Sequence, residues 1–219
     1  MLESTRSQIS SINIDKQRPL IISDADEVLL IFMEHFEHFL STKGCYFDWS
    51  SFKLTGNIHR YSDKYTLAQE EVFNFLKSFF DDETKNLKQV PGASDSLKRL
   101  SKRAQIVVLS NVGAEYHSDR KQCLDRHGMQ YPLVANRGEK GPAVKALAQG
   151  MAAPVFFLDD SPNNIHSVAR EARFVRRIHF VHDQRLRKLV DKASDSHHRL
   201  DTWNGAEAAI NNELNEAGY

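Results

Sequence analysis

Short, nearly continuous apolar runs separated by helical patterns are the feature that most constrains the fold of this chain. Four runs are clear, and a fifth, "RIHFV" at 177–181, is weaker; the clear ones are "PLII" at 19–22, "IVVL" at 106–109, "PLV" at 132–134 and "VFFL" at 155–158. Runs this short, with no alternation of polar residues, are typical of parallel strands that are covered on both faces. The sequence therefore predicts a parallel sheet buried between layers.

Helical patterns lie between these runs. "SDSLKRLSK" at 94–102 offers Ser94 or Asp95 as an N-cap, and "KGPAVKALAQG" at 140–150 ends on a glycine that would stop a helix. "DSPNNIHSVAREA" places Ser161 at an N-cap and Pro162 at the first helical position, where its missing N–H is harmless. Strands that alternate with helices predict an α/β fold, a Rossmann-like open parallel sheet with helices on both faces.

Residues 31–88 break this alternation and contain no clear strand. "IFMEHFEHFL" at 31–40 has helical apolar spacing, and "TLAQEEVFNFLKSFF" at 66–80 opens with Thr66 and Gln69 in capping-box spacing. The segment is too long for a plain crossover. We therefore expect a small helical cap at 31–88, an α/β core formed by 18–30 and 89–219, and a flexible N-terminal segment at 1–17.

Composition excludes several classes of protein. The 29 basic and 29 acidic residues cancel, so no overall basic field favours nucleic acid. The two cysteines, Cys45 and Cys123, form no metal-binding pair and are best interpreted as isolated reduced thiols. The N-terminal residues lack the apolar core of a signal peptide, and no apolar run is long enough to span a bilayer. We expect a cytoplasmic protein without a membrane or nucleic-acid partner, and the sequence leaves its oligomeric state open.

Polar residues follow the clearest of these strands directly. In an open parallel sheet, ligands bind just beyond the carboxyl ends of the strands, so these side chains should meet in one crevice. They are Asp24 and Asp26 after the first run, Ser110 and Asn111 after the second, Asp159 and Asp160 after the fourth, and Lys140 at a helix start between the last two.

A metal ion is one expected occupant of this crevice. Clustered carboxylates need a compensating cation, and Mg²⁺ prefers carboxylate and carbonyl oxygens. Asp24 and Asp159 are the expected carboxylate ligands, and the backbone carbonyl of Asp26 would add an oxygen. Asp160 would bind the ion, directly or through water, or else hold Lys140. The direct ligand therefore stays open between Asp159 and Asp160, with Asp159 preferred.

Phosphoryl chemistry would use the same residues. Asp24 can attack phosphorus and form an aspartyl phosphate, and Asp26 can protonate the leaving oxygen and then deprotonate water. Ser110 can donate a hydrogen bond to a phosphoryl oxygen, Asn111 lies beside it at the rim, and Lys140 adds positive charge. Ser110, Asn111 and Lys140 are thus the expected substrate-binding residues.

The ordered motifs resemble the haloacid dehalogenase (HAD)-like hydrolases, most of which are phosphatases. "DADEV" at 24–28 resembles the first motif, "VVLSN" at 107–111 the second, Lys140 the third and "FFLDDSPNNI" at 156–165 the fourth. The position of 31–88 resembles the subgroup whose helical cap follows the first motif. The resemblance implies the HAD-like core fold, Mg²⁺ as cofactor, and the aspartyl-phosphate route through Asp24 and Asp26.

Glu27 departs from this pattern, because the family usually has glycine there. The sequence assigns Glu27 no role: it could face the cap, touch a substrate amine or point away.

The expected function is hydrolysis of a small phosphorylated metabolite. Three alternatives remain: a phosphotransferase or mutase, a dehalogenase on the same scaffold, and a non-catalytic binding protein. Asp26 argues against the dehalogenase, which needs no general acid at that position.

Overall fold

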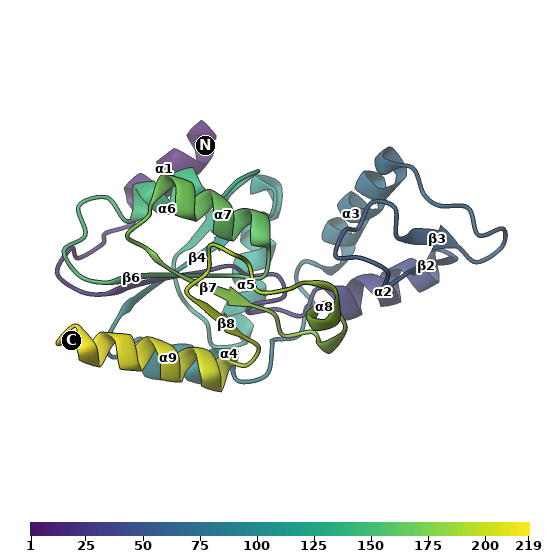
Figure 1. The fold of residues 1–219 in the computed structure, drawn as a ribbon. Helices are drawn as coiled ribbons and strands as arrows, with labels where there is room; N and C mark the ends of the chain where they lie inside the picture. The colour runs from purple at the N-terminus through teal and green to yellow at the C-terminus, as the bar shows by residue number, and fades with distance from the viewer.

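The computed structural model describes residues 1–219 and contains one central parallel sheet (Figure 1). Five of its strands are those that the apolar runs predict, and the sixth, at the sheet edge, was not predicted. Their spatial order is β5 (Leu133–Ala135), β4 (Gln105–Ser110), β1 (Leu20–Ser23), β6 (Val155–Asp159), β7 (Arg176–Phe180) and β8 (His198–Leu200). β8 is short, half-buried and rich in polar residues, so it has none of the apolar character of the central strands.

Strand register brings the functional strand ends to one edge. Ile22 of β1 pairs with Val107 of β4 and with Phe157 of β6, and all three strands run in the same direction. The residues that follow Ser23, Leu109 and Leu158 therefore reach the same carboxyl edge of the sheet. This geometry agrees with the crevice that the sequence predicts.

Helices cover both faces of the sheet, as the buried strands require. Alternate residues of a strand pack into two separate hydrophobic cores, one on each face of the sheet. Leu20 and Ile22 of β1 belong to one core, and Ile21 belongs to the other. In Figure 1 the first face lies under α1 (Glu3–Ser11), α6 (Gly141–Leu147) and α7 (Pro162–Glu171). The opposite face carries α4 (Ala93–Leu100), α5 (His117–Arg126) and α9 (Trp203–Glu216).

Helix ends agree with the sequence in part. α7 begins at Pro162 with Ser161 at its N-cap, as predicted. α4 is preceded by Gly92, whose φ of +82° is left-handed, so neither Ser94 nor Asp95 is the N-cap. α6 ends at Leu147, before the glycine that was expected to stop it.

Residues at the two ends of the chain form helices that pack on the core. α1 lies within the segment for which we expected flexibility, and the hydroxyl of its Thr5 donates to the carbonyl of Ala135 at 3.0 Å. α9 buries Trp203, Ile210 and Leu214 against the sheet and α4. Cys45 and Cys123 are both buried and free, as predicted. None of the helices combines the length and the apolar character needed to cross a membrane.

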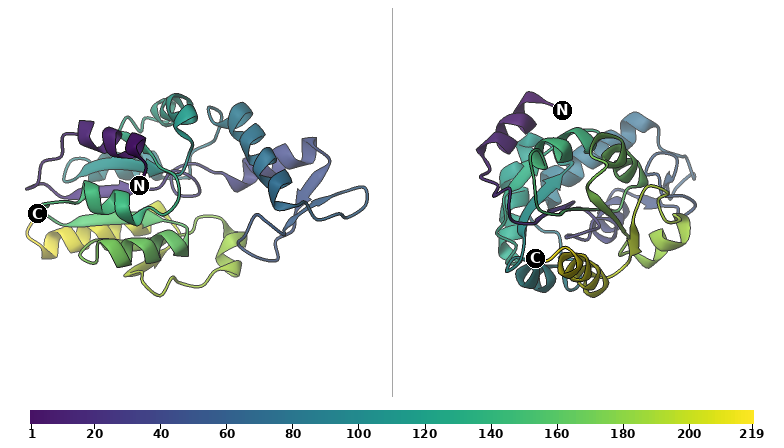
Figure 2. Two further views of the ribbon diagram at one scale, coloured as in Figure 1. Left: turned by 90° about the horizontal axis from the view of Figure 1, so that it is seen from above. Right: turned by 60° about the vertical axis from the view of Figure 1, so that its left-hand side comes forward.

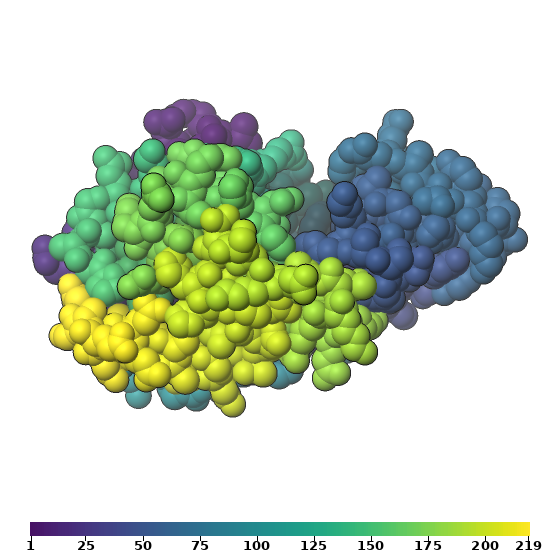
Figure 3. All heavy atoms as spheres, viewed as in Figure 1, coloured from purple at the N-terminus to yellow at the C-terminus, as the bar shows by residue number.

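The segment at 31–88 forms a lobe that projects from one end of the core (Figures 2 and 3). It contains the helices α2 (Met33–Thr42) and α3 (Gln69–Glu83), and also an antiparallel pair of strands, β2 (Cys45–Phe47) and β3 (Ile58–Arg60). The expectation that this segment holds no strand was therefore wrong, because each strand is only three residues long and leaves no periodic signal.

Aromatic rings form the centre of the lobe. The ring of Phe79 on α3 meets those of Phe32, Phe36 and Phe39 edge-on, at centroid distances of 5.2, 5.2 and 5.6 Å. Such edge-to-face pairs add to the free energy of simple burial. α3 begins after Ala68, and Glu71 accepts from the Ala68 N–H at 2.8 Å, so the expected Thr66–Gln69 capping box is not formed.

Candidate active site

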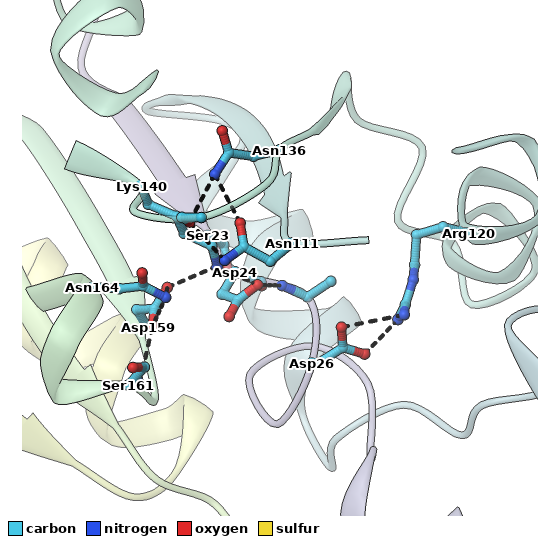
Figure 4. A network of polar contacts seen from close by, with 12 residues as sticks. Ser23, Asp24, Asp26, Asn111, Arg120, Asn136, Lys140, Asp159, Ser161 and Asn164 are labelled. Carbon is cyan, nitrogen blue, oxygen red and sulfur yellow. Dashed lines mark hydrogen bonds and ion pairs between the residues drawn. The ribbon is translucent and has the colours of Figure 1, made fainter. Parts of the chain in front are cut away.

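Lys140 joins two of the predicted acidic residues in a buried ion triad (Figure 4). Its Nζ lies 2.6 Å from Oδ1 of Asp24 and 2.8 Å from Oδ2 of Asp159. Lys140 immediately precedes α6, and both its side chain and that of Asp159 are completely buried. The structure thus brings the first, third and fourth sequence motifs into direct contact.

Burial changes the acidity of these groups. The pKa of Asp24 is raised to about 7, because burial, which raises it most, and the neighbouring Asp159 and Asp26 together outweigh the lowering by Lys140. The pKa of Asp160 is raised well above its usual value, by burial and by its acidic neighbours. Burial alone would lower the pKa of Lys140, but Asp159 and Asp24 outweigh it and raise that pKa, so Lys140 stays an ammonium.

The two oxygens of Asp24 have different surroundings. Oδ1 accepts the Ala25 N–H at 2.6 Å and also contacts Lys140. The backbone holds the residue from both sides: the Asp24 N–H donates to the carbonyl of Leu158 at 2.9 Å, and the Ser23 hydroxyl donates to the Asp24 carbonyl at 2.8 Å. Oδ1 is therefore engaged, and Oδ2 is the oxygen that remains available for chemistry.

Asp159 is fixed by the start of α7. Its carboxylate accepts from the Ser161 N–H at 2.9 Å and from the Asn164 side-chain amide at 3.0 and 3.2 Å. The partner of Lys140 in the fourth motif is thus Asp159, and not Asp160 as one of our alternatives had it. Asn164, for which the sequence suggested no site role, supports this carboxylate directly.

Asp160 completes an acidic cluster with Asp24 and Asp159. One carboxylate oxygen from each of the three lies within 4.8 Å of the others. Because one ammonium faces three carboxylates, the charges do not balance, and hard oxygen donors of this kind suit a divalent cation such as Mg²⁺. The donor set therefore fits the metal that the sequence suggests.

Ser110 and Asn111 have different environments. Ser110 is fully buried at the end of β4, and its hydroxyl has no hydrogen-bond partner within the protein. The side-chain amide of Asn111 donates to the carbonyl of Gly138 at 2.9 Å, and its oxygen accepts from Asn136 at 2.8 Å. Asn111 thus braces the loop after β5, while Ser110 retains an unused hydroxyl.

Asp26 points away from this cluster, toward Arg120 of α5 (Figure 4). The guanidinium of Arg120 donates to both carboxylate oxygens, at 2.7 and 3.2 Å. Sequence reasoning missed this partner, because Arg120 lies in the polar stretch "HSDRKQCLDR", where a basic residue would normally face solvent. In the fold it is completely buried.

Glu27 now has a structural role. Its φ of +57° is left-handed, a conformation in which glycine is easily accommodated. Its Oε1 accepts the N–H groups of Phe32 and Met33 at 2.9 and 2.7 Å, so it caps the first helix of the lobe. Burial raises its pKa to about 7, although these two hydrogen bonds lower it.

α9 also supports the loop that carries the two aspartates. The indole N–H of Trp203 donates to the carbonyl of Val28 at 2.8 Å. The C-terminal helix is thus attached directly to the segment that follows the candidate nucleophile.

Comparisons with known proteins identify the fold. No protein-family model and no curated protein matches the chain. A haloacid dehalogenase-like protein of unknown function from Agrobacterium tumefaciens has a TM-score of 0.64 at 18% identity, covering 89% of this chain and 98% of that one. A HAD family hydrolase from Deinococcus radiodurans, solved with phosphate and sodium, has a TM-score of 0.60 at 14% identity, covering 90% and 97%.

CbbY from Rhodobacter sphaeroides, solved as a variant with xylulose-(1,5)-bisphosphate, is also similar. Its TM-score is 0.55 at 14% identity, over 84% of this chain and 94% of that one. These similarities extend over most of this chain and nearly the whole of each of the others. The chain therefore has the haloacid dehalogenase-like α/β fold that its sequence motifs predicted.

Proposed function

We propose that this protein is a Mg²⁺-dependent phosphatase that hydrolyses a small phosphorylated metabolite through an aspartyl-phosphate intermediate. The observation that carries the proposal is the Lys140 bridge, which fixes one oxygen of Asp24 and leaves the other free at the carboxyl edge of the sheet. Two structures of the same fold, solved with phosphate and with a sugar bisphosphate, support this substrate class.

Asp24 is the proposed nucleophile. Its Oδ2 would form a bond to phosphorus while the bond from phosphorus to the leaving oxygen breaks. The Lys140 ammonium would favour the ionised form of Asp24 against the effect of burial, and it would attract the phosphoryl group. The buried Ser110 hydroxyl would donate to a phosphoryl oxygen and so obtain the partner that it lacks within the protein.

Asp26 is the proposed acid and base. Its carboxyl would give a proton to the leaving oxygen and would later take one from the water that hydrolyses the aspartyl phosphate. Asp24, Asp159 and Asp160 would hold Mg²⁺, with the backbone carbonyl of Asp26 as a further donor. The ion would supply positive charge that neutralises the phosphoryl oxygens.

The lobe at 31–88 is the proposed cap. Its helix α3 contacts the core through the Tyr116 hydroxyl, which donates to Asp81 at 2.7 Å. A lobe held over the carboxyl edge of the sheet can exclude water and select the substrate.

The test is an assay of a panel of phosphorylated metabolites and a generic aryl phosphate, with Mg²⁺ and with EDTA. We expect Mg²⁺-dependent phosphate release by the wild type and none by Asp24→Asn with its fold intact. Asp191→Asn, a change of an exposed acid, is the matched control. Product analysis with added acceptor sugars separates hydrolysis from phosphoryl transfer, and turnover by Asp24→Asn would overturn the nucleophile assignment.

A further inference from the structure

The buried pair formed by Arg120 and Asp26 points to a function for Arg120 that the sequence motifs do not assign. We propose that Arg120 is a positioning residue, which holds the Asp26 carboxyl in the orientation from which it transfers protons in the proposed phosphatase reaction. This inference rests on the proposed function, because it concerns how that site controls its acid and base.

The geometry of the pair is specific. Two separate nitrogens of Arg120, Nη1 and Nη2, donate to the two separate oxygens of Asp26. A bidentate fork of this kind fixes the plane of a carboxylate as well as its distance, which a lysine cannot do. Asp26 itself retains 24% exposure of its side chain, so without Arg120 its carboxyl would be free to sample other rotamers.

Stability does not explain an arginine at this position. Arg120 is completely buried, Asp26 is its only hydrogen-bond acceptor, and its Nε has no partner. A buried N–H without an acceptor costs free energy, and an apolar side chain of similar size would avoid that cost. We therefore explain the presence of Arg120 by its effect on the Asp26 carboxylate, the one group that it binds.

That group belongs to the loop that carries the proposed nucleophile. Asp26 lies two residues after Asp24, and its carboxyl is turned toward α5 (Figure 4). In the transfer step one Asp26 oxygen gives its proton to the leaving oxygen as the bond from that oxygen to phosphorus breaks. Arg120 can retain the second oxygen during this step, so the carboxyl reaches the substrate from a defined point.

The inference predicts an effect that depends on the leaving group. The leaving group of an alkyl phosphate is a strongly basic alkoxide, which needs the proton from Asp26. The leaving group of dinitrophenyl phosphate is a weakly basic phenolate, which departs without a proton. General acid catalysis is typically worth about 10²–10⁴-fold in rate, so loss of a positioned acid should affect the alkyl ester selectively. A residue needed only for folding would affect both esters equally.

The experiment measures kcat/KM for glycerol phosphate and for 2,4-dinitrophenyl phosphate, because this parameter reports the step in which the leaving group departs. For Arg120→Met we expect roughly a tenfold or larger loss on glycerol phosphate and a much smaller loss on the aryl ester. Arg120→Lys, which keeps the charge but replaces the fork by a single donor nitrogen, should recover part of the loss. Arg126→Met, an exposed arginine on the same helix, is the matched control.

A double-mutant cycle tests whether Arg120 acts through Asp26. Asp26→Asn should show the same selectivity for the leaving group, and adding Arg120→Met to it should cause no further selective loss. Equal losses on both esters, or no loss on glycerol phosphate, would overturn the inference while leaving the phosphatase proposal intact. If the wild type hydrolyses neither ester, and no phosphorylated metabolite, the proposed function and the inference fail together.

Discussion

Lys140 and Asp24 lie 2.6 Å apart, from Nζ to Oδ1, in a region that is almost closed to solvent. The contact connects the start of α6 to the end of β1, so it links two elements of the core as well as two residues of the candidate site. Asp159 shares the same ammonium at 2.8 Å. Removal of Lys140 would leave two buried carboxylates without their cation.

We expect Lys140→Met to abolish phosphatase activity and to lower the free energy of unfolding. Breaking a buried ion pair typically costs about 3–5 kcal/mol, because the remaining charge is desolvated without compensation. Urea denaturation of the variant and the wild type, both in EDTA, measures this difference. Lys145→Met, a change of an exposed lysine in α6, is the control, and an equal effect of the two substitutions would contradict the role of the triad.

Ser110→Ala should separate activity from stability. The hydroxyl is buried and makes no hydrogen bond within the protein, so its loss should leave the melting temperature unchanged or slightly higher. Removing a donor to a developing anion commonly lowers kcat by about 10²–10³-fold. We therefore expect a large loss of phosphatase activity at constant stability. A variant that is destabilised but fully active would show that the hydroxyl serves the fold instead.

Glu27 offers a matched pair of substitutions. Glu27→Ala and Glu27→Gly both remove the carboxylate that caps α2 through the N–H groups of Phe32 and Met33. Loss of a helix cap typically costs about 1 kcal/mol. Alanine must also adopt the left-handed φ of +57°, which glycine adopts without strain. We expect the glycine variant to be the more stable by about 1 kcal/mol in chemical denaturation, since a left-handed conformation costs other residues that much. Equal stabilities would argue against this account.

The central sheet was predictable because its strands are short apolar runs. Leu20–Ile22, Val107–Leu109 and Phe156–Leu158 are nearly all fully buried, so their composition alone indicates strands covered on both faces. The residues that follow them reach one edge for the same reason. The α/β fold and the grouping of the site residues at one edge of the sheet could therefore be predicted from local sequence patterns.

The contacts within the site were less predictable. Asp159 and Asp160 are adjacent carboxylates, and only the turn into α7 decides that Asp159 meets Lys140. Arg120 contacts Asp26 across 94 positions of sequence, and no local pattern records such a contact. The sequence showed that Glu27 stands where the resembling family usually has glycine. Its capping of α2 could not be predicted, because it depends on a backbone turn that has no sequence signal.

Arg185 connects the core to the projecting lobe on the side of α8 (Gln184–Leu189), where Figure 3 shows the two in contact. Its Nη1 lies 2.6 Å from Oε2 of Glu37 on α2, and its guanidinium stacks on the ring of Trp49 at 3.9 Å from the centroid. The indole N–H of Trp49 donates to Glu37 at 2.7 Å, so the three side chains form one unit.

We expect Arg185→Ala to loosen the lobe without unfolding the core. Arg185 is 43% exposed, and exposed ion pairs are typically worth about 0–1 kcal/mol, so the global stability should change little. Amide hydrogen exchange should instead become faster in α2 and in the loop around Trp49, while β1 and β6 keep their protection. Lys188→Ala, on the same helix, is the control. If exchange in α2 is unchanged in Arg185→Ala, then other contacts, such as that of Tyr116 with Asp81 of α3, are sufficient to hold the lobe against the core.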